Sequence, residues 1–175
     1  MCYNFLHEIL EAILMIRGTC GKNLNWNLDA KGTLIISGIG DMNNQHWNGE
    51  GWWWQHEKIM IRKIIINEGV TSIGDYAFSE CTSLSSVTIP NSVTTIGEQA
   101  FSYCENLTTI TIPDKVTAIG EGAFKYCESL FAVELPANLT EIGENAFYAC
   151  KSLTTIIISN KITSIGEDAL TRCEG

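Results

Sequence analysis

Apolar and polar positions repeat along most of the chain with a fixed period, so that the pattern beginning at Val70 returns at Val93 and again at Val116. Each unit opens on Val, Leu or Ile, continues through Ile-Gly, Ala-Phe and Cys, and closes on the pattern L-x-x-V/I-x-I/L. A single unit of this size cannot bury its own apolar face, so neighbouring units must stack to form a continuous core. Four full units of equal length and a terminal half unit follow this frame, at 70–92, 93–115, 116–138, 139–161 and 162–175.

The closing segment of each unit predicts a β-strand. Residues 84–89 of the first unit end in an alternation of apolar and polar positions and include β-branched residues, which is typical of a strand. Pro90, Pro113 and Pro136 follow the strands directly. Because proline donates no backbone hydrogen bond, each of them predicts a corner at which the strand ends.

The opening half of each unit predicts a backbone turn and a short helical turn, which would form the side of the coil opposite the strand. A glycine follows the isoleucine in every unit, from Gly74 to Gly166, and predicts a backbone turn with positive φ. The acidic residue behind it, such as Glu98, predicts the start of a short helical turn, because a carboxylate favours a helix N-terminus. The expected fold is therefore an α/β repeat, a right-handed solenoid with a parallel strand face and short helical turns on its convex side.

The region before the repeats predicts a cap. Residues 47–69 fit the frame as a degenerate first repeat, because Ile61, Ile64 and Ile66 fall on the strand columns. In residues 18–46, apolar and polar residues alternate around the turn sequence DAKG, which predicts a β-hairpin. This N-terminal β cap would cover the core and the strand edge that the first coil otherwise exposes.

The two ends of the sequence allow several interpretations of how the chain is exported and of what adjoins its last repeat. Residues 1–17 form an apolar N-terminal leader or extension. Their first residues lack Lys and Arg, and two glutamates, Glu8 and Glu11, interrupt the apolar stretch, so they are a poor secretion signal. This segment is compatible with three alternatives: export through another signal, a sequence that is a fragment of a longer protein, or a misplaced start codon. The terminal half unit leaves a strand edge uncovered, which predicts end-to-end self-association or further domains.

The repeat frame V-T-x-I-G-x-x-A-F-x-x-C-x-x-L-x-x-V-x-I-P resembles the BspA-type leucine-rich repeats of bacterial surface proteins. The segment GTCGKNLNWNLDAKGTLIISGIGDM, residues 18–42, is similar to the cap that often precedes such repeats. The resemblance covers residues 18–175 and implies a leucine-rich-repeat-like solenoid. It also implies a secreted or cell-surface location and a non-enzymatic binding function, often that of an adhesin for host proteins.

Composition and charge narrow the set of partners. The chain has 175 residues, 45% of them hydrophobic, a net charge of −9 and a pI near 4.7. A chain this acidic repels phosphate backbones and anionic lipid, so nucleic acids and anionic membranes are not expected partners. No apolar run reaches the roughly 18–20 residues that a membrane-spanning helix needs, so membrane insertion is not expected.

The cysteine column raises the question of chemistry. Its members are Cys81, Cys104, Cys127, Cys150 and Cys173. One cysteine per repeat, always at the same position, gives a line of thiols rather than the tetrahedron that zinc requires. Stacked strands hold equivalent residues too far apart, with parallel Cα–Cβ vectors, for disulfides. All three histidines lie outside the repeats, which leaves no base beside a thiol nucleophile. We therefore expect buried, inert thiols that pack as small core residues, with no catalytic residue, metal or cofactor.

The outward positions of the strands form the candidate partner-binding surface, because solenoids use this extended face for recognition. We name it the strand face: Arg62, Lys63, Ser86, Thr88, Thr109, Thr111, Phe131, Glu134, Thr155 and Ile157. Phe131 is the large apolar side chain in its middle, which is the usual character of an interface anchor. The leading hypothesis is protein binding through this face, with a host extracellular-matrix or surface protein as the kind of partner.

The alternative is a carbohydrate-binding module that uses the tryptophan-rich segment HWNGEGWWWQHEK. Clustered tryptophans stack on sugars or anchor protein partners. Trp47, Trp52 and Trp53 are the candidate glycan or partner contacts. Packing within the cap is the competing role for these side chains.

Overall fold

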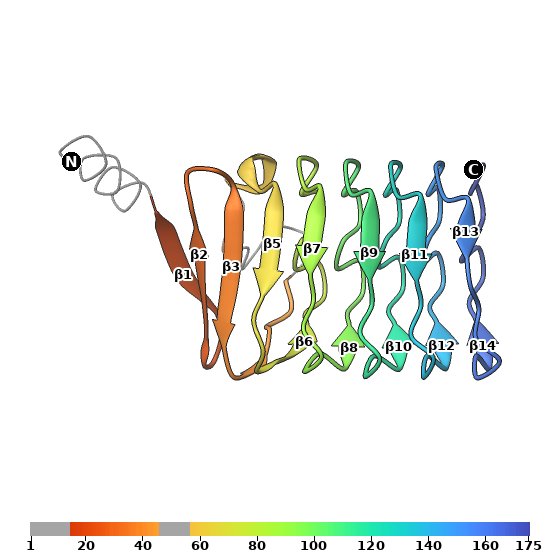
Figure 1. Ribbon diagram of the computed structural model, residues 1–175, viewed down its shortest axis with the longest axis horizontal. Helices are drawn as coiled ribbons and strands as arrows, with labels where there is room; N and C mark the ends of the chain where they lie inside the picture. The colour runs from red at the N-terminus through yellow and green to blue at the C-terminus, as the bar shows by residue number, and fades with distance from the viewer. Residues whose placement is uncertain (1–14, 46–56) are drawn as a thin grey trace, which may run out of the picture.

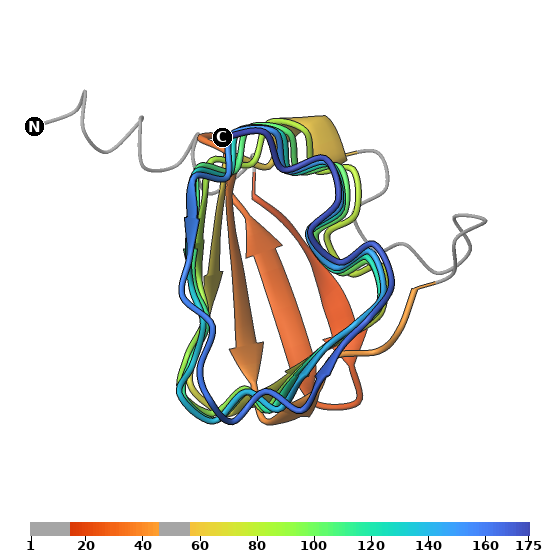
Figure 2. The same cartoon turned by 90° about the vertical axis from the view of Figure 1, so that its right-hand side faces the viewer.

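The computed structural model describes residues 15–45 and 57–175. The chain winds into a solenoid whose coils stack along the long axis from the N-terminal to the C-terminal end (Figure 1). Seen along that axis, the coils follow nearly the same outline (Figure 2). The predicted parallel-strand solenoid is confirmed, because each coil places its strands beside those of the coils before and after it.

Two stacks of parallel strands run along the solenoid. The first, which carries the strand face, contains β5 (Lys63–Ile66), β7 (Ser86–Thr88), β9 (Thr109–Thr111), β11 (Ala132–Glu134) and β13 (Thr155–Ile156). Its ladders form two sheets: β5 and β7 belong to the sheet that includes the cap, and β9, β11 and β13 form a second sheet. The second contains β4 (Gly40–Asp41), β6 (Val70–Ile73), β8 (Thr95–Ile96), β10 (Ala118–Ile119), β12 (Glu141–Ile142) and β14 (Ser164–Ile165).

Residues that pair between neighbouring coils occupy the same position of the repeat. Ile64 lies opposite Val87 in the first stack, and Ile119 lies opposite Ile142 in the second. Side chains follow the same register: the hydroxyl of Thr94 donates to the carbonyl of Thr71 at 3.1 Å, across a sequence separation of 23. One repeat is therefore one coil. The second stack was not predicted from the sequence.

The cap is an antiparallel sheet of β1 (Ile16–Gly21), β2 (Leu24–Leu28) and β3 (Thr33–Gly38). The predicted hairpin is confirmed as β2 and β3. Its turn is held by the Asp29 carboxylate, which accepts from the backbone N–H of Lys31 at 2.9 Å and of Thr33 at 2.7 Å. Strand β3 pairs in parallel with β5, so the cap continues the first stack. Strand β1 adds a third cap strand that the sequence pattern did not predict.

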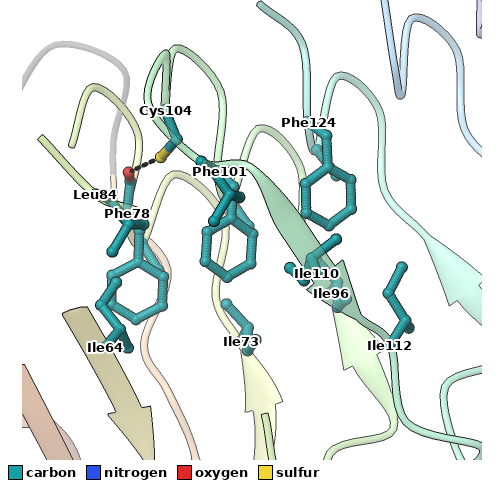
Figure 3. Close-up of a cluster of buried hydrophobic side chains, with 14 of the residues drawn as sticks. Ile64, Ile73, Phe78, Leu84, Ile96, Phe101, Cys104, Ile110, Ile112 and Phe124 are labelled. Atoms are coloured by element: carbon teal, nitrogen blue, oxygen red, sulfur yellow. Dashed lines mark hydrogen bonds between the residues drawn. The ribbon is translucent and has the colours of Figure 1, made fainter. Parts of the chain in front are cut away.

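The core lies between the two stacks and is built from columns of identical side chains. Phe78, Phe101, Phe124 and Phe147 are fully buried. Their ring centroids follow one another at 5.2, 5.4 and 5.2 Å, with stacked planes. Figure 3 shows the first three of these rings, with isoleucine side chains below them. Offset stacking of this kind adds to the free energy that burial of the rings already provides.

The short helical turns predicted for the convex side are wrong. On this side every second backbone N–H leaves its own coil: Gln99, Phe101 and Tyr103 each donate to a carbonyl of the next coil at 2.8 Å. The residues between them, Ala100 and Ser102, donate to the carbonyl three positions back. An α-helix needs consecutive N–H groups to bond within the segment, and the left-handed φ of Gln99 (47°) and Tyr103 (59°) interrupts it. Within the described residues the single helix is the 3₁₀ element η1 (Lys58–Met60).

The prediction for the glycine column is also wrong. None of the five column glycines between Gly74 and Gly166 has a positive φ. The reason for glycine is close approach between coils: a Cβ on Gly120 would lie 2.6 Å from the carbonyl carbon of Gly97 and 2.7 Å from the backbone nitrogen of Glu98. These atoms belong to the backbone and cannot move aside, so a methyl group would push the coils apart.

Candidate interaction surface

The strand face is exposed along the whole solenoid. All ten side chains predicted for it are solvent-exposed, from Arg62 to Ile157. Strand pairing sets them in rows, with Thr111 opposite Glu134 and Lys63 opposite Ser86. Equivalent positions of neighbouring coils therefore present a regular array of side chains across several strands.

Phe131 projects from a fixed backbone. Its N–H donates to the carbonyl of Thr108 at 3.0 Å, and its own carbonyl accepts from the N–H of Thr154 at 3.3 Å. The hydroxyl of Thr154 also donates to that carbonyl, at 3.1 Å. The side chain is 49% exposed. A rigid backbone under an exposed aromatic side chain lowers the entropy that binding would cost.

Two of the predicted residues line the same groove. Thr111 and Glu134 border a depression of about 190 Å³ at the corner where the strands end. Its walls include Pro113 and Pro136, whose carbonyls accept from the N–H three residues later. The proline corners therefore fix the shape of this groove, as the sequence pattern predicted for a strand end.

The structure adds cap residues to the face. Ile35 lies opposite Ile65, and Ile65 lies opposite Thr88, so β3 extends the row of Thr88 toward the N-terminus. Ile35 is 36% exposed, whereas its neighbours Leu34 and Ile36 are fully buried. The alternation of apolar and polar residues within residues 33–38 contains this signal, since it places Ile35 on the face opposite Leu34 and Ile36.

The cysteine column is buried, as the sequence predicted. Within the described residues, Cys20 and four of the column thiols are inaccessible and Cys173 is half-buried; all are free. The S–H of Cys104 donates to the carbonyl oxygen of Phe78 at 3.3 Å, as the dashed line in Figure 3 marks. The same contact recurs from Cys127 and Cys150 to the phenylalanine of the preceding coil, at 3.2 Å each. Each thiol thus ties its coil to the one before it.

Burial also suppresses the reactivity of these thiols. Desolvation raises the pKa of Cys81 to about 12, against a small opposing effect of Lys58. It raises the pKa of Cys150 to about 12 as well. A thiolate is the reactive form of cysteine, so thiols held in this way are poor nucleophiles and poor metal ligands.

A family model for the BspA type leucine-rich repeat region matches residues 56–175 in six copies. The chain belongs to the BspA-type leucine-rich-repeat family. The resemblance inferred from the repeat frame is thereby confirmed. No curated protein matches this BspA-type chain at a significant level.

Solved structures of bacterial leucine-rich-repeat proteins share the fold. One from Eubacterium ventriosum is 19% identical with a TM-score of 0.56, and the match covers 90% of this chain and 63% of that one. A leucine-rich cell surface protein from Faecalibacterium prausnitzii is 28% identical with a TM-score of 0.58, covering 90% and 52%. A leucine-rich repeat protein from T. pallidum is 21% identical with a TM-score of 0.62, covering 89% and 80%. The chain thus spans less than two thirds of the length of the first two.

The tryptophan contacts predicted from the sequence lie outside the described residues, within which no cluster of metal ligands and no membrane-spanning helix is found. Trp47, Trp52 and Trp53 lie within residues 46–56, outside the described part, and so does His46. Across residues 15–45 and 57–175, no three His, Cys, Asp or Glu side chains gather in a way that could hold a metal ion. Within the same residues, no helix has the length and apolar character needed to cross a membrane.

Proposed function

We propose that this BspA-type repeat protein is a non-catalytic module that binds a protein partner through its strand face, in adhesion or host interaction at a bacterial cell surface. The observation that supports the proposal most directly is the continuous exposed array on β5 to β13, with Phe131 near its middle. Leucine-rich-repeat folds are general scaffolds for protein–protein interaction, and an extended solenoid face suits a large flat partner.

The composition of the face favours a protein over a small ligand. Ser, Thr and Ala surround Phe131, and small side chains permit close approach of a second backbone or side chain. Interfaces concentrate their binding free energy on a few aromatic anchors among nearly neutral contacts that exclude water. Phe131 is 49% exposed and Ile157 is 75% exposed, so both have apolar surface to bury. The surface location is supported by the F. prausnitzii neighbour, which is described as a cell surface protein.

A binding panel of immobilised host extracellular-matrix and surface proteins tests the proposal. Against a partner found in the panel, Phe131→Ala should weaken binding by about 2 kcal/mol or more, roughly thirtyfold, because it removes the anchor. Thr109→Lys should also impair binding, since it places a charge within the apolar part of the patch. Neither variant should shift the unfolding midpoint appreciably, because both side chains are exposed.

Thr95→Lys is the matched control. Thr95 is also an exposed threonine on a short parallel strand, but it lies on β8 in the second stack. Thr95→Lys adds the same charge as Thr109→Lys, but on another side of the coil, and should leave binding unchanged. If both strand-face variants bind normally, the strand face is not the site. If the chain instead binds sugars on a glycan array and loses that binding with Trp52→Ala or Trp53→Ala, it is a carbohydrate-binding module.

A further inference from the structure

Three tyrosines form a row along the corner where the convex turns lead toward the strand face. The ring of Tyr103 stacks on that of Tyr126 with centroids 4.6 Å apart, and Tyr126 meets Tyr148 edge-on at 5.6 Å. Tyr103 is 40% exposed. The row therefore runs across successive coils as a partly exposed aromatic ridge.

The later part of this ridge already holds cations of the chain. The ammonium of Lys125 lies 5.6 Å from the ring centroid of Tyr126 and 5.2 Å from that of Tyr148. The guanidinium of Arg172 lies 5.5 Å from the ring of Tyr148. Beside the ridge, the ammonium of Lys151 is 2.6 Å from the carboxylate of Glu128. In these coils an aromatic ring and a carboxylate are each matched by a lysine.

One coil earlier the same two positions lack their cations. Tyr103 and Glu105 occupy the positions that Tyr126 and Glu128 fill in the following repeat. Where Lys125 and Lys151 would recur, the chain has Ser102 and Glu128. Among the described residues, no cation lies over the Tyr103 ring and no ion pair reaches the Glu105 carboxylate. Within residues 15–45 and 57–175, this repeat thus presents an aromatic ring with no cation over it and a carboxylate with no ion pair.

A cavity of about 410 Å³ opens at this place. It is lined by Lys58, Ile59, Glu80, Thr82, Tyr103 and Glu105. Lys58 belongs to η1, the short yellow coiled ribbon at one edge of the solenoid in Figure 1. Its ammonium pairs with the carboxylate of Glu80 at 3.5 Å, which leaves Glu105 as the second charge. Tyr103 lines the cavity, and Tyr126 stacks on its ring from the side of the following coil.

We propose that this cavity receives a basic side chain of a bound polypeptide, arginine in preference to lysine. A guanidinium stacks flat on an aromatic ring and donates a fork of N–H groups to a carboxylate, which fits Tyr103 and Glu105 together. Cation–π attraction to the ring adds to the pairing with the carboxylate. The chain's net charge of −9 attracts a basic partner from a distance. The site is separate from the strand face and does not depend on it.

Two small probes that differ in charge test the proposal on the whole chain. N-acetyl-arginine methylamide carries the guanidinium, and the corresponding citrulline derivative carries a neutral planar urea of similar shape. Titrations followed by NMR should show saturable shifts at Thr82, Tyr103 and Glu105 with the arginine probe and not with the citrulline probe. The binding should weaken as salt rises, because exposed charges are screened.

Variants of the chain complete the test. Glu105→Gln should weaken arginine binding about threefold or more, as expected for loss of an exposed ion pair combined with stacking. Tyr103→Asn should weaken it likewise, and asparagine tolerates the left-handed φ of this position. Glu141→Gln is the matched control, because it makes the same change in net charge at an exposed residue of β12 that does not line the cavity; binding should stay within about twofold.

Three results would overturn the proposal. Equal shifts with the citrulline probe would show that charge does not matter. Arginine binding that survives Glu105→Gln unchanged, or that maps elsewhere on the surface, would show that this cavity is not the receptor. Shifts at Tyr103 with a neutral methyl glycoside, and none with the arginine probe, would assign the cavity to sugars instead.

Discussion

Replacing Cys104 with alanine tests what the cysteine column contributes. Cys104 is fully buried, and its thiol donates to the carbonyl of Phe78 at 3.3 Å. That carbonyl also accepts from the N–H of Cys81 at 3.3 Å. The substitution therefore removes one buried sulfur and one weak hydrogen bond, but it leaves no backbone acceptor without a donor.

The expected loss follows from these contacts. Burial of a group about the size of one methylene contributes roughly 0.8 kcal/mol. A weak S–H···O contact adds about 0.5 kcal/mol. The neighbouring rings of Phe78 and Phe101, which stack directly on each other, limit the collapse of the space left behind, and an unfilled cavity adds to the cost. Cys104→Ala should therefore reduce the free energy of unfolding by about 1–2 kcal/mol.

Denaturant unfolding followed by intrinsic fluorescence measures this loss, with Cys173→Ala as the matched comparison. Cys173 makes the same contact, to Phe147 at 3.3 Å, but is only half-buried, so its replacement should cost less than half as much. In a background that carries both Cys2→Ser and Cys173→Ser, a thiol reagent should label the folded protein slowly and the unfolded protein fast, because the other column thiols are buried. Partner binding should not change, because the column lies inside the coils.

Three outcomes would refute this reasoning. If Cys104→Ala unfolds at the wild-type midpoint, the column does not support the core. If Cys104→Ala and Cys173→Ala cost the same, burial is not the source of the effect. If the folded protein reacts with the reagent as fast as the unfolded protein, the thiols of the interior coils are accessible.

Two further predictions concern backbone packing and pH. Gly120→Ala should lower the free energy of unfolding by about 2 kcal/mol or more, because its methyl group would overlap backbone atoms of the previous coil. Gly122→Asn should be nearly neutral, because Asn145 fills the same left-handed position one coil later. Similar losses for the two variants would show that contact between coils is not the reason for glycine at position 120. Burial raises the thiol pKa in the folded state, to about 12 for Cys81. The buried thiols therefore do not lower the free energy of unfolding below about pH 8.5, where they are protonated in both states. Above that pH the unfolded thiols lose their protons first, and the free energy of unfolding should fall by up to about 1.4 kcal/mol per pH unit for each buried thiol. Unfolding midpoints at pH 7, 9 and 9.5 measure this slope. Cys104→Ala should reduce the slope by the share of one thiol, and a flat profile for the unmodified chain would contradict the reasoning.

The sequence by itself determined the repeat length, the first strand stack and the core columns. The strict period that separates Phe78 from Phe101 and Ile73 from Ile96 can place Phe above Phe and Ile above Ile only if one period is one turn of a solenoid. Buried columns then follow from the apolar pattern, since each coil must cover the next. The strand face followed as well, because side chains alternate along a strand and the core-facing set was already known.

Only the tertiary structure decided the path of the backbone on the other sides of the coil. The strands of the second stack are mostly two residues long, too short to carry a pattern, and bonds to neighbouring coils hold them. The left-handed positions are filled by Tyr, Gln, Glu and Arg as well as Gly, so residue type alone did not mark them. The glycine column reflects the backbone of the adjacent coil rather than a local turn. The physical reason is the same in each case: the backbone N–H groups and carbonyls of these segments find their partners in the next coil, and a pattern read along one coil does not contain that contact.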